Sequence, residues 1–235
     1  MLIESTTHNG LVRENNEDRL LIKSFENGTA LLALADGMGG HAAGEIAAEL
    51  SLEGFKSLGP ASPDIQSELL RIVTEAQTAI QEASRFDRSL KGMGTTLTAV
   101  FIAGRIAYWA QVGDSRLYIF RSGVLEQLTR DHTIPGMLLD KGEISREQAR
   151  LHPYANVLTR CLGCDRFEPD IGTTELRESD LLMLSTDGLH DCIPDAVIAS
   201  CLALDISLKD KLNRLVSECL EAGAKDNITA ILMEF

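Results

Sequence analysis

The chain has 235 residues, of which 44% are hydrophobic, and its 35 acidic and 22 basic side chains give a formal net charge of −13. This hydrophobic content is typical of a globular protein with a sizeable core, and it excludes a disordered or fibrous chain. The acidic balance disfavours nucleic acid and anionic membrane as main partners because both would be repelled, whereas cations would be attracted.

No segment has the features of a membrane span or a secretory signal. The longest wholly apolar run covers residues 30–35, far below the roughly 20 residues that a spanning helix needs. Residues 1–10 contain no apolar core of a signal peptide. We therefore expect no membrane insertion and a cytoplasmic location.

Segments rich in β-branched and aliphatic residues, bounded by Gly, Asp or Asn, predict seven strands. In chain order they cover residues 19–24, 30–35, 96–103, 105–112, 117–121, 181–185 and 228–235. Short glycine-containing turns join several of them, at Gly28, Gly104 and Gly123, and predict antiparallel hairpins.

Helical patterns come in two pairs. The first pair is predicted at residues 44–58 and in the segment after Ser62-Pro63, which would supply the N-cap and the first helical proline; the second pair is predicted at 194–204 and 207–222. Paired helices among antiparallel strands predict an α+β fold with helices on the outer faces of a sheet core. Neither a repeat nor a linker divides the sequence, so we expect a single domain over residues 1–235.

The segment between Asp131 and Leu158 has no strand pattern and only a short helical piece near residues 145–150. A connection of this length in a compact domain is usually functional. We predict a flap over about residues 133–155, while a surface loop without function is the alternative.

Acidic residues recur where predicted strands end. Three strands run directly into an aspartate, a fourth strand starts just after one, and two further acids precede the first strand: Asp36, Asp114, Asp187, Asp226, Glu17 and Asp18. If the last strand is antiparallel to the others, its start lies beside their ends. Four aspartates would then share one edge of the fold, which Glu17 and Asp18 could join.

Clustered carboxylates cannot all be ionised in a partly desolvated site unless a positive charge lies among them. An all-oxygen set without His or Cys suits Mg²⁺ or Mn²⁺ better than Zn²⁺ or copper. A lone Asp-Gly is usually only a turn. Four such carboxylates at consistent strand ends indicate a divalent-cation site.

Two other motifs are weaker. Residues 37–42 fit G-x-G-x-x-A, a dinucleotide fingerprint, but Asp36 would lie against the pyrophosphate and no alternating strand–helix pattern follows. Cys161 and Cys164 form one CxxC among five cysteines. With no second pair and no nearby His, we expect two ordinary thiols there and no disulfide framework.

Eight motifs occur in the order seen in one family: residues 13–18 (RENNED), 35–40 (ADGMGG), 92–96 (GMGTT), 112–116 (VGDSR), 128–132 (LTRDH), 156–160 (NVLTR), 185–188 (STDG) and 226–229 (DNIT). With these motifs the chain resembles the metal-dependent protein phosphatases, the type 2C serine/threonine phosphatases of the PPM family, and in particular their short bacterial members. The resemblance implies a four-layer αββα sandwich with two antiparallel sheets flanked by helix pairs.

The resemblance also implies roles for particular residues. Asp36 would bridge two Mn²⁺ or Mg²⁺ ions, and the inner shell would be completed by the Gly37 carbonyl, Asp187 and Asp226. Glu17 would hold metal-bound water, and Asp114 with Asp187 would support a third, weaker ion. Arg13 would bind the substrate phosphate. In such sites two metals activate a water for in-line attack on phosphorus, and a guanidinium binds phosphate oxygens bidentately.

One position departs from the eukaryotic pattern, because Met38 stands where those members have a histidine proposed as the acid. We expect His41 to pack at a helix start, so water on the third metal is the better acid. The implied substrates are phosphoserine and phosphothreonine proteins positioned by the flap, opposite a cognate bacterial Ser/Thr kinase, and we expect a monomer. A pseudophosphatase is the alternative, which the intact Asp36, Asp187, Asp226 and Arg13 disfavour.

Overall fold

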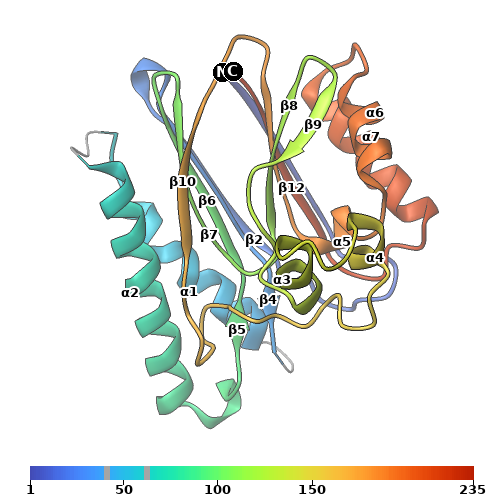
Figure 1. The fold of residues 1–235 in the computed structure, drawn as a ribbon. Helices are drawn as coiled ribbons and strands as arrows, with labels where there is room; N and C mark the ends of the chain where they lie inside the picture. Colours follow the sequence, from blue (N-terminus) through green and yellow to red (C-terminus); the bar gives the residue numbers. More distant parts are fainter. Residues whose placement is uncertain (40–42, 61–63) are drawn as a thin grey trace.

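A computed structural model describes residues 1–39, 43–60 and 64–235. Two five-stranded antiparallel sheets stack face to face (Figure 1). The first has the order β1-β12-β11-β8-β9, with β1 Leu2–His8, β8 Arg116–Arg121, β9 Val124–Gln127, β11 Leu181–Ser185 and β12 Ile228–Glu234. The second has the order β10-β7-β6-β3-β2, with β2 Arg19–Ser24, β3 Ala30–Ala35, β6 Leu97–Ala103, β7 Ile106–Val112 and β10 Asp170–Glu175.

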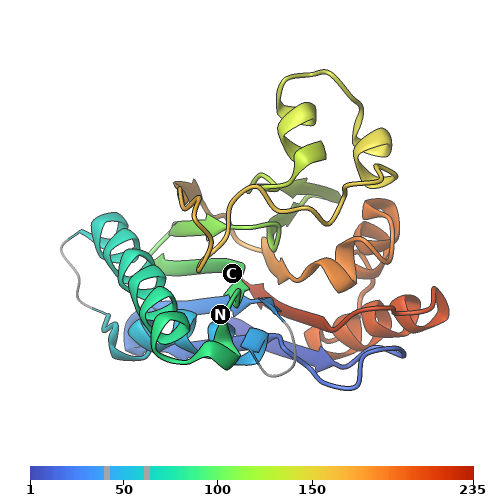
Figure 2. The same cartoon turned by 90° about the horizontal axis from the view of Figure 1, so that it is seen from below.

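Helices cover the outer faces of both sheets. The pair α1 (Ala43–Ser57) and α2 (Ile65–Phe86) packs on the second sheet, and α6 (Asp195–Leu202) and α7 (Leu208–Glu221) pack on the first. Figure 2, seen from below, shows the two helix pairs on opposite sides of the stacked sheets. The predicted four-layer αββα arrangement is confirmed.

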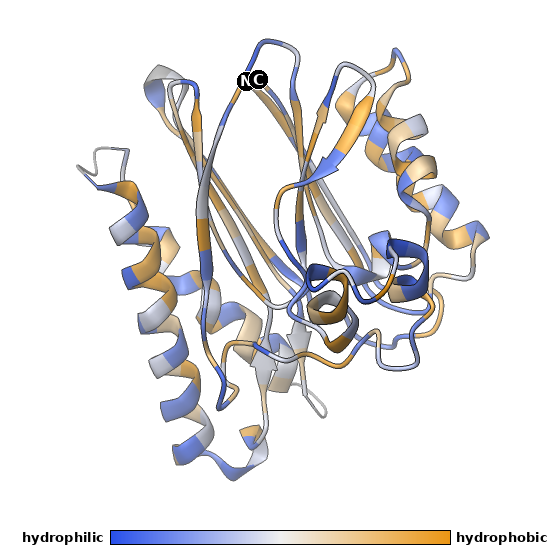
Figure 3. Cartoon of the chain, viewed as in Figure 1, coloured by the Kyte–Doolittle hydropathy of each residue, from blue (hydrophilic) through white to orange (hydrophobic). Residues whose placement is uncertain are grey.

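The core has three apolar layers, one between the sheets and one under each helix pair. Strand β3 has an unbroken apolar sequence because it is buried on both faces. Leu31 and Ala33 point toward α1 and α2, whereas Leu32 and Leu34 point toward the other sheet. Figure 3 shows the hydrophobic strands inside and the mixed colouring of the amphipathic helix α2 outside.

All seven predicted strands are present, with ends that move by a residue or two. Strands β1, β9 and β10 and the two-residue strands β4 (Gly37–Met38) and β5 (Gly94–Thr95) were not predicted. The side chains of β1 and β10 are exposed or half-buried at sheet edges, and both strands are rich in Thr, Glu or Ser. A polar edge strand lacks the apolar run on which the prediction relied.

The helix pairs differ from prediction at one start. Helix α2 begins at Ile65 with Asp64 as its N-cap, whose side chain accepts a hydrogen bond from the Ser67 amide. Ser62 and Pro63, predicted as the cap, lie outside the described residues, as does His41. No helix within residues 1–39, 43–60 and 64–235 is long and apolar enough to cross a bilayer.

Candidate active site

The predicted site residues line one cavity of about 690 Å³ at one end of the sandwich: Arg13, Glu17, Asp36, Gly37, Asp114, Asp187 and Asp226. Both sheets contribute to it. Asp36 and Asp114 follow β3 and β7 of the second sheet, while Asp187 follows β11 of the first. Because β12 pairs antiparallel with β11, Asp226 at its start lies at the same end. The strand-end argument therefore describes the observed placement of the four aspartates.

Neighbouring threonines fix the backbone of Asp36. The Thr96 hydroxyl accepts a hydrogen bond from the Asp36 amide at 3.0 Å, and the Thr96 amide donates back to the Asp36 carbonyl at 2.9 Å. The Thr95 hydroxyl donates to the same carbonyl at 2.8 Å. A two-stranded ribbon of β4 (Gly37–Met38) and β5 (Gly94–Thr95) continues this contact. The sequence analysis quoted Thr95 and Thr96 within a motif but gave them no role.

Gly37 lies where no side chain fits. A methyl group there would overlap the backbone carbonyl of Gly44 and approach the Glu17 carbonyl at 2.7 Å. A methyl on Gly44 would in turn overlap the Glu17 carboxylate. The close approach of these three residues explains why glycine stands at 37, and it sets Glu17 against the start of α1.

Burial and mutual repulsion dominate the electrostatics of the cavity. Burial raises the pKa of Asp36 well above its ordinary value, and the nearby charges of Asp18 and Asp187 raise it further. Burial also raises the pKa of Asp114 strongly, with repulsion from Asp187 next. The pKa of Asp187 rises to about 7, first through burial and then through Asp191 and Asp226. These acids resist ionising together unless a cation compensates them.

Asp18, which the sequence analysis only grouped with Glu17, is a buried member of the same cluster. Its Oδ2 accepts a hydrogen bond from the Thr186 hydroxyl at 3.0 Å. Its Oδ1 is buried and has no hydrogen-bond partner. Burial raises the pKa of Asp18 to about 6. An unpartnered buried carboxylate oxygen is costly for the fold, and it fits a site where an ordered ligand or water completes the contacts.

Arg13 is the basic side chain at the rim of this cavity. Its side chain is 55% exposed, and it donates to Asp226 Oδ2 at 2.7 Å. This hydrogen bond raises the pKa of Arg13. Asn227 holds the adjoining segment, accepting from the Glu17 amide and donating to the Asn9 and Asn15 carbonyls. Arg13 is therefore placed to meet an anion that enters the cavity.

Asp114 is held by the turn before it. Gly113 has a left-handed backbone (φ +102°), and a methyl group there would lie 2.6 Å from the Thr96 side chain, so the turn requires glycine. The His132 amide donates to the Gly113 carbonyl at 2.9 Å, and the Gly113 amide donates to His132 Nδ1 at 3.2 Å. His132 Nε2 lies 3.3 Å from Asp170. His132 thus orders the turn that carries Asp114.

The flap segment, residues 133–155, contains two helices where one was predicted. Helix α3 (Ile134–Asp140), capped by the Thr133 hydroxyl, was not predicted; it has Pro135 in its first turn, where proline is tolerated. Helix α4 (Arg146–Arg150) was predicted. Both project beyond the sheets in Figure 2, and a bridge between Thr133 and Leu158 closes the base of the segment.

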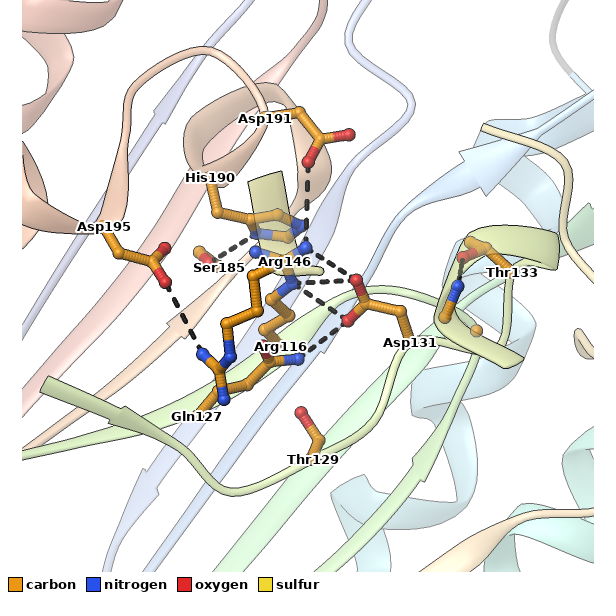
Figure 4. A network of polar contacts seen from close by, with 12 residues as sticks. Arg116, Gln127, Thr129, Asp131, Thr133, Arg146, Ser185, His190, Asp191 and Asp195 are labelled. Carbon is orange, nitrogen blue, oxygen red and sulfur yellow. Dashed lines mark hydrogen bonds and ion pairs between the residues drawn. The ribbon is translucent and has the colours of Figure 1, made fainter. Parts of the chain in front are cut away.

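A second cavity, of about 900 Å³, lies between the flap segment, β8–β9 and the start of α6, and Asp114 lines both cavities. Its wall holds an ion-pair network (Figure 4). Arg116 donates bidentately to Asp131 at 2.6 and 2.9 Å and lies 3.8 Å from Asp191. Arg146 of α4 lies 3.8 Å from Asp195 of α6. No motif in the sequence points to this cavity, because its charges come from four separate segments.

The donor set of the first cavity suits a hard cation, since it consists of carboxylate and carbonyl oxygens, with no His in the lining and with its one cysteine, Cys164, bonded to Cys161. In the described ranges no three His, Cys, Asp or Glu side chains converge closely enough to hold one ion as they stand. Met38 also lines this cavity and has no proton to donate.

The prediction of two ordinary thiols in the CxxC is wrong, because Cys161 and Cys164 are joined as a disulfide. The backbone turn through Gly163 (φ +84°) brings the two residues together. Cys192, Cys201 and Cys219 are free. Cys164 lies in the wall of the carboxylate cavity.

Comparison with known proteins gives consistent matches. The family model described as Protein phosphatase 2C matches residues 5–235. The chain is 38% identical over 227 residues to the serine/threonine protein phosphatase PstP of Mycobacterium tuberculosis, covering 96% of this chain but only 43% of that protein. It is 34% identical over 241 residues to the serine/threonine phosphatase Stp of Listeria monocytogenes, covering 100% of this chain and 96% of that protein.

A solved structure of a serine/threonine protein phosphatase is also similar to this chain. The catalytic domain of PstP, in complex with two manganese ions, superposes with a TM-score of 0.88 at 35% sequence identity, covering 99% of this chain and 97% of that one.

Proposed function

Since this chain belongs to the protein phosphatase 2C family, we propose that it is a metal-dependent phosphatase that hydrolyses phosphoserine and phosphothreonine in proteins at the carboxylate cavity. The observation that carries the proposal is the gathering of Asp36, Asp114, Asp187 and Asp226 from four strand ends, with Arg13 at the rim. Carboxylates whose pKa values are raised by burial and then by one another need a cation to act as anions together.

The residues that would hold two Mn²⁺ or Mg²⁺ ions are Asp36 as the bridge, the Gly37 carbonyl, Asp187 and Asp226, with Glu17 through water and Asp114 with Asp187 at a third, weaker site. The two manganese ions in the PstP structure support the binuclear part of this assignment. When bound, such ions lower the pKa of a water and offset charge on the phosphoryl group.

The chain's own residues bind and orient. Arg13 presents a guanidinium that can donate to two phosphate oxygens, and its Nη2 also donates to Asp226 Oδ2. Thr95 and Thr96 hold Asp36 by its backbone, so its carboxylate is preorganised without a change of conformation. Met38 cannot donate a proton. We therefore expect the proton for the leaving serine or threonine oxygen to come from the part of the cavity that Asp114 lines.

The wider assignments belong to the same proposal. Residues 1–235 form one catalytic domain, the flap positions the phosphoprotein beside the second cavity, and the enzyme works as a cytoplasmic monomer against a cognate Ser/Thr kinase. Asp114 lines both cavities, so they are neighbours, which supports a substrate that extends from the flap to the carboxylates.

Hydrolysis of p-nitrophenyl phosphate and of a phosphothreonine peptide with added Mn²⁺, and its loss with a chelator, tests the proposal. A protein that binds Mn²⁺ but hydrolyses neither substrate would instead be a pseudophosphatase. Removing residues 144–151 tests the flap: we expect a much larger loss on phosphoprotein than on p-nitrophenyl phosphate, which needs only the cavity. Equal losses would show that the segment supports the fold.

A further inference from the structure

The disulfide adjoins the backbone that supports Asp36. Leu162, between the two cysteines, exchanges two hydrogen bonds with Thr95, from the Thr95 amide to the Leu162 carbonyl at 3.0 Å and from the Leu162 amide to the Thr95 carbonyl at 2.9 Å. The Thr95 hydroxyl then donates to the Asp36 carbonyl. Two hydrogen-bonded steps therefore connect the Cys161–Cys164 loop to the proposed bridging ligand.

The same loop also packs against the ribbon that presents Gly37. A methyl group built on Gly94 would lie 3.3 Å from Met38 Cε and 3.5 Å from Cys161 Sγ. The Cys161 sulfur and the Met38 side chain thus flank Gly94 together, at the edge of β5 that pairs with β4. A change in the position of Cys161 would be felt directly by these two short strands.

The two sulfurs differ in access. Cys161 is fully buried, at 0% exposure. Cys164 is half-buried and contributes to the wall of the carboxylate cavity. A small oxidant or thiol can therefore begin only at Cys164, and the cavity is an entrance to it.

Gln77 of α2 holds the loop independently of the sulfurs. Its amide group donates to the Cys164 carbonyl at 3.0 Å, and its carbonyl accepts from the Gly163 amide at 2.6 Å. None of the Gln77 contacts involves a sulfur atom, so we expect them to hold the loop near α2 when the S–S bond is absent. Opening the bond is then a local loosening that can be reversed, since the two thiols stay close to each other.

We propose that Cys161 and Cys164 form a reversible thiol–disulfide modification site, reached through the catalytic cavity at Cys164, whose oxidised state tightens the support of Asp36. Oxidation by a peroxide proceeds in two balanced steps. The Cys164 thiolate attacks one peroxide oxygen, giving a sulfenic acid as hydroxide leaves; the Cys161 thiol then attacks that sulfur, forming the S–S bond as water leaves. Two molecules of a small thiol reverse it by exchange, and they leave as their own disulfide.

The chemistry is tested by mass spectrometry of the dithiothreitol-reduced protein after treatment with hydrogen peroxide. The wild type and the matched control Cys192→Ser, which removes a cysteine that is also half-buried, should each lose two hydrogens. Cys161→Ser should instead hold a sulfenic acid on Cys164 that a dimedone probe traps. A wild type that forms no Cys161–Cys164 bond, or a Cys161→Ser protein that is not labelled, overturns the proposal.

Access is tested by the rate at which Cys164 reacts with an aromatic disulfide reagent in Cys161→Ser/Cys192→Ser. Mn²⁺ with inorganic phosphate should slow this reaction severalfold, and should not slow the reaction of Cys192 in Cys161→Ser/Cys164→Ser. An equal effect on both thiols, or none on Cys164 in a protein that calorimetry shows to bind Mn²⁺, overturns entry through the cavity.

The coupling to Asp36 rests on the proposed function and has its own readout. Reduction of the wild type should weaken Mn²⁺ binding in calorimetry by about 10-fold, the lower end of what loss of a supporting contact around a metal ligand costs. Cys161→Ser/Cys164→Ser should match the reduced protein, and Cys192→Ser should respond as the wild type does. Equal affinity in both redox states overturns the coupling, whereas a protein that binds no Mn²⁺ in either state contradicts the proposed function and leaves the disulfide chemistry to the mass measurement.

Discussion

The two ends of β11 each carry an aspartate, buried at the start of the strand and half-buried at its end, and only the first is paired with an arginine. At the start of the strand, Asp180 is 2% exposed and accepts two hydrogen bonds from Arg121, at 2.6 and 2.8 Å. At its end, Asp187 is half-buried among other acids. Burial raises the pKa of Asp180, but the hydrogen bonds and charge of Arg121, together with a hydrogen bond from the Arg177 amide at 2.7 Å, outweigh it and the pKa is lowered. At Asp187 the pKa rises to about 7.

The difference between Asp180 and Asp187 separates two kinds of carboxylate. One kind is paired with an arginine and stabilises the fold, and the other has no such partner and suits the binding of a cation. The Arg116–Asp131 pair beside the second cavity belongs with Asp180, because the chain supplies the positive charge. The cluster of Asp18, Asp36, Asp114 and Asp187 has no such buried partner within the described residues, and Arg13 reaches only Asp226 at the rim. An external cation is the compensation that this end of the molecule lacks.

The largest effect should come from Asp187→Asn. We expect a loss of phosphatase activity of at least about 100-fold, because a charged metal ligand is removed. Removal of a residue that only hydrogen-bonds to a metal ligand already costs up to about 100-fold. The melting temperature without metal should stay level or rise, since one source of repulsion disappears. Steady-state kinetics with Mn²⁺ and thermal unfolding with a chelator measure both. Wild-type Mn²⁺ affinity in this variant would show that Asp187 is not a ligand.

Asp114→Ala should divide substrates by their leaving groups. Loss of general acid catalysis costs about 10²- to 10⁴-fold, so the rate on a phosphoserine peptide should fall by that range. The rate on p-nitrophenyl phosphate, whose leaving group hardly needs a proton, should fall much less. If Asp114 only completes the Gly113 turn, the two rates will change in parallel and the melting temperature will drop.

Asp180→Asn should affect stability instead of chemistry. Removal of a charged hydrogen-bond partner from Arg121 costs about 1.5–3 kcal/mol, so the free energy of unfolding should fall by that amount while kcat stays unchanged. Glu178→Gln is the matched control, because Glu178 is exposed and lies 3.5 Å from Arg105; exposed pairs contribute about 0–1 kcal/mol. Urea unfolding of both variants decides whether the arginine makes the difference.

The smallest effect is a pH dependence of the metal-free protein. Asp18 binds its proton more tightly when folded, with a pKa of about 6, than when unfolded, near 3.8. The folded state then carries more protons in this window, and stability falls as the pH rises from about 4 to about 6. Asp18→Asn keeps an acceptor for the Thr186 hydroxyl. In this variant the melting temperature should depend less on pH between about 4 and about 6. An unchanged slope would show that Asp18 is ionised without a cation.

The sequence could predict the ligand-bearing ends because the signal is local. A buried strand followed by Asp, as in β3 and Asp36, shows both burial and the end of the strand in a few residues. The supporting contacts were invisible for the opposite reason. His132 reaches Gly113 across 19 positions, and Leu162 reaches Thr95 across 67. Such contacts depend on how distant segments pack, which no short motif records.

The elements of the fold also divide into those that local sequence predicts and those that it does not. Strand β3 was predicted within its true bounds because it is buried on both faces, whereas the edge strand β1 has only partner hydrogen bonds to define it. The disulfide was missed because a CxxC pattern alone is compatible with thiols, and only the turn at Gly163 brings the sulfurs together.

The pairing of β1 with β12 has a practical consequence for anyone handling this protein. Leu2 lies opposite Glu234, and His8 opposite Ile228, so both chain ends meet at the pole of the sandwich away from Asp226, as Figure 1 shows. A purification tag, a fluorescent fusion or a tether to a surface can be joined at either end without obstructing the cavity. The same adjacency makes the chain suitable for circular permutation, with a short peptide joining the old ends and new ones opened in an exposed turn such as Ser122–Gly123.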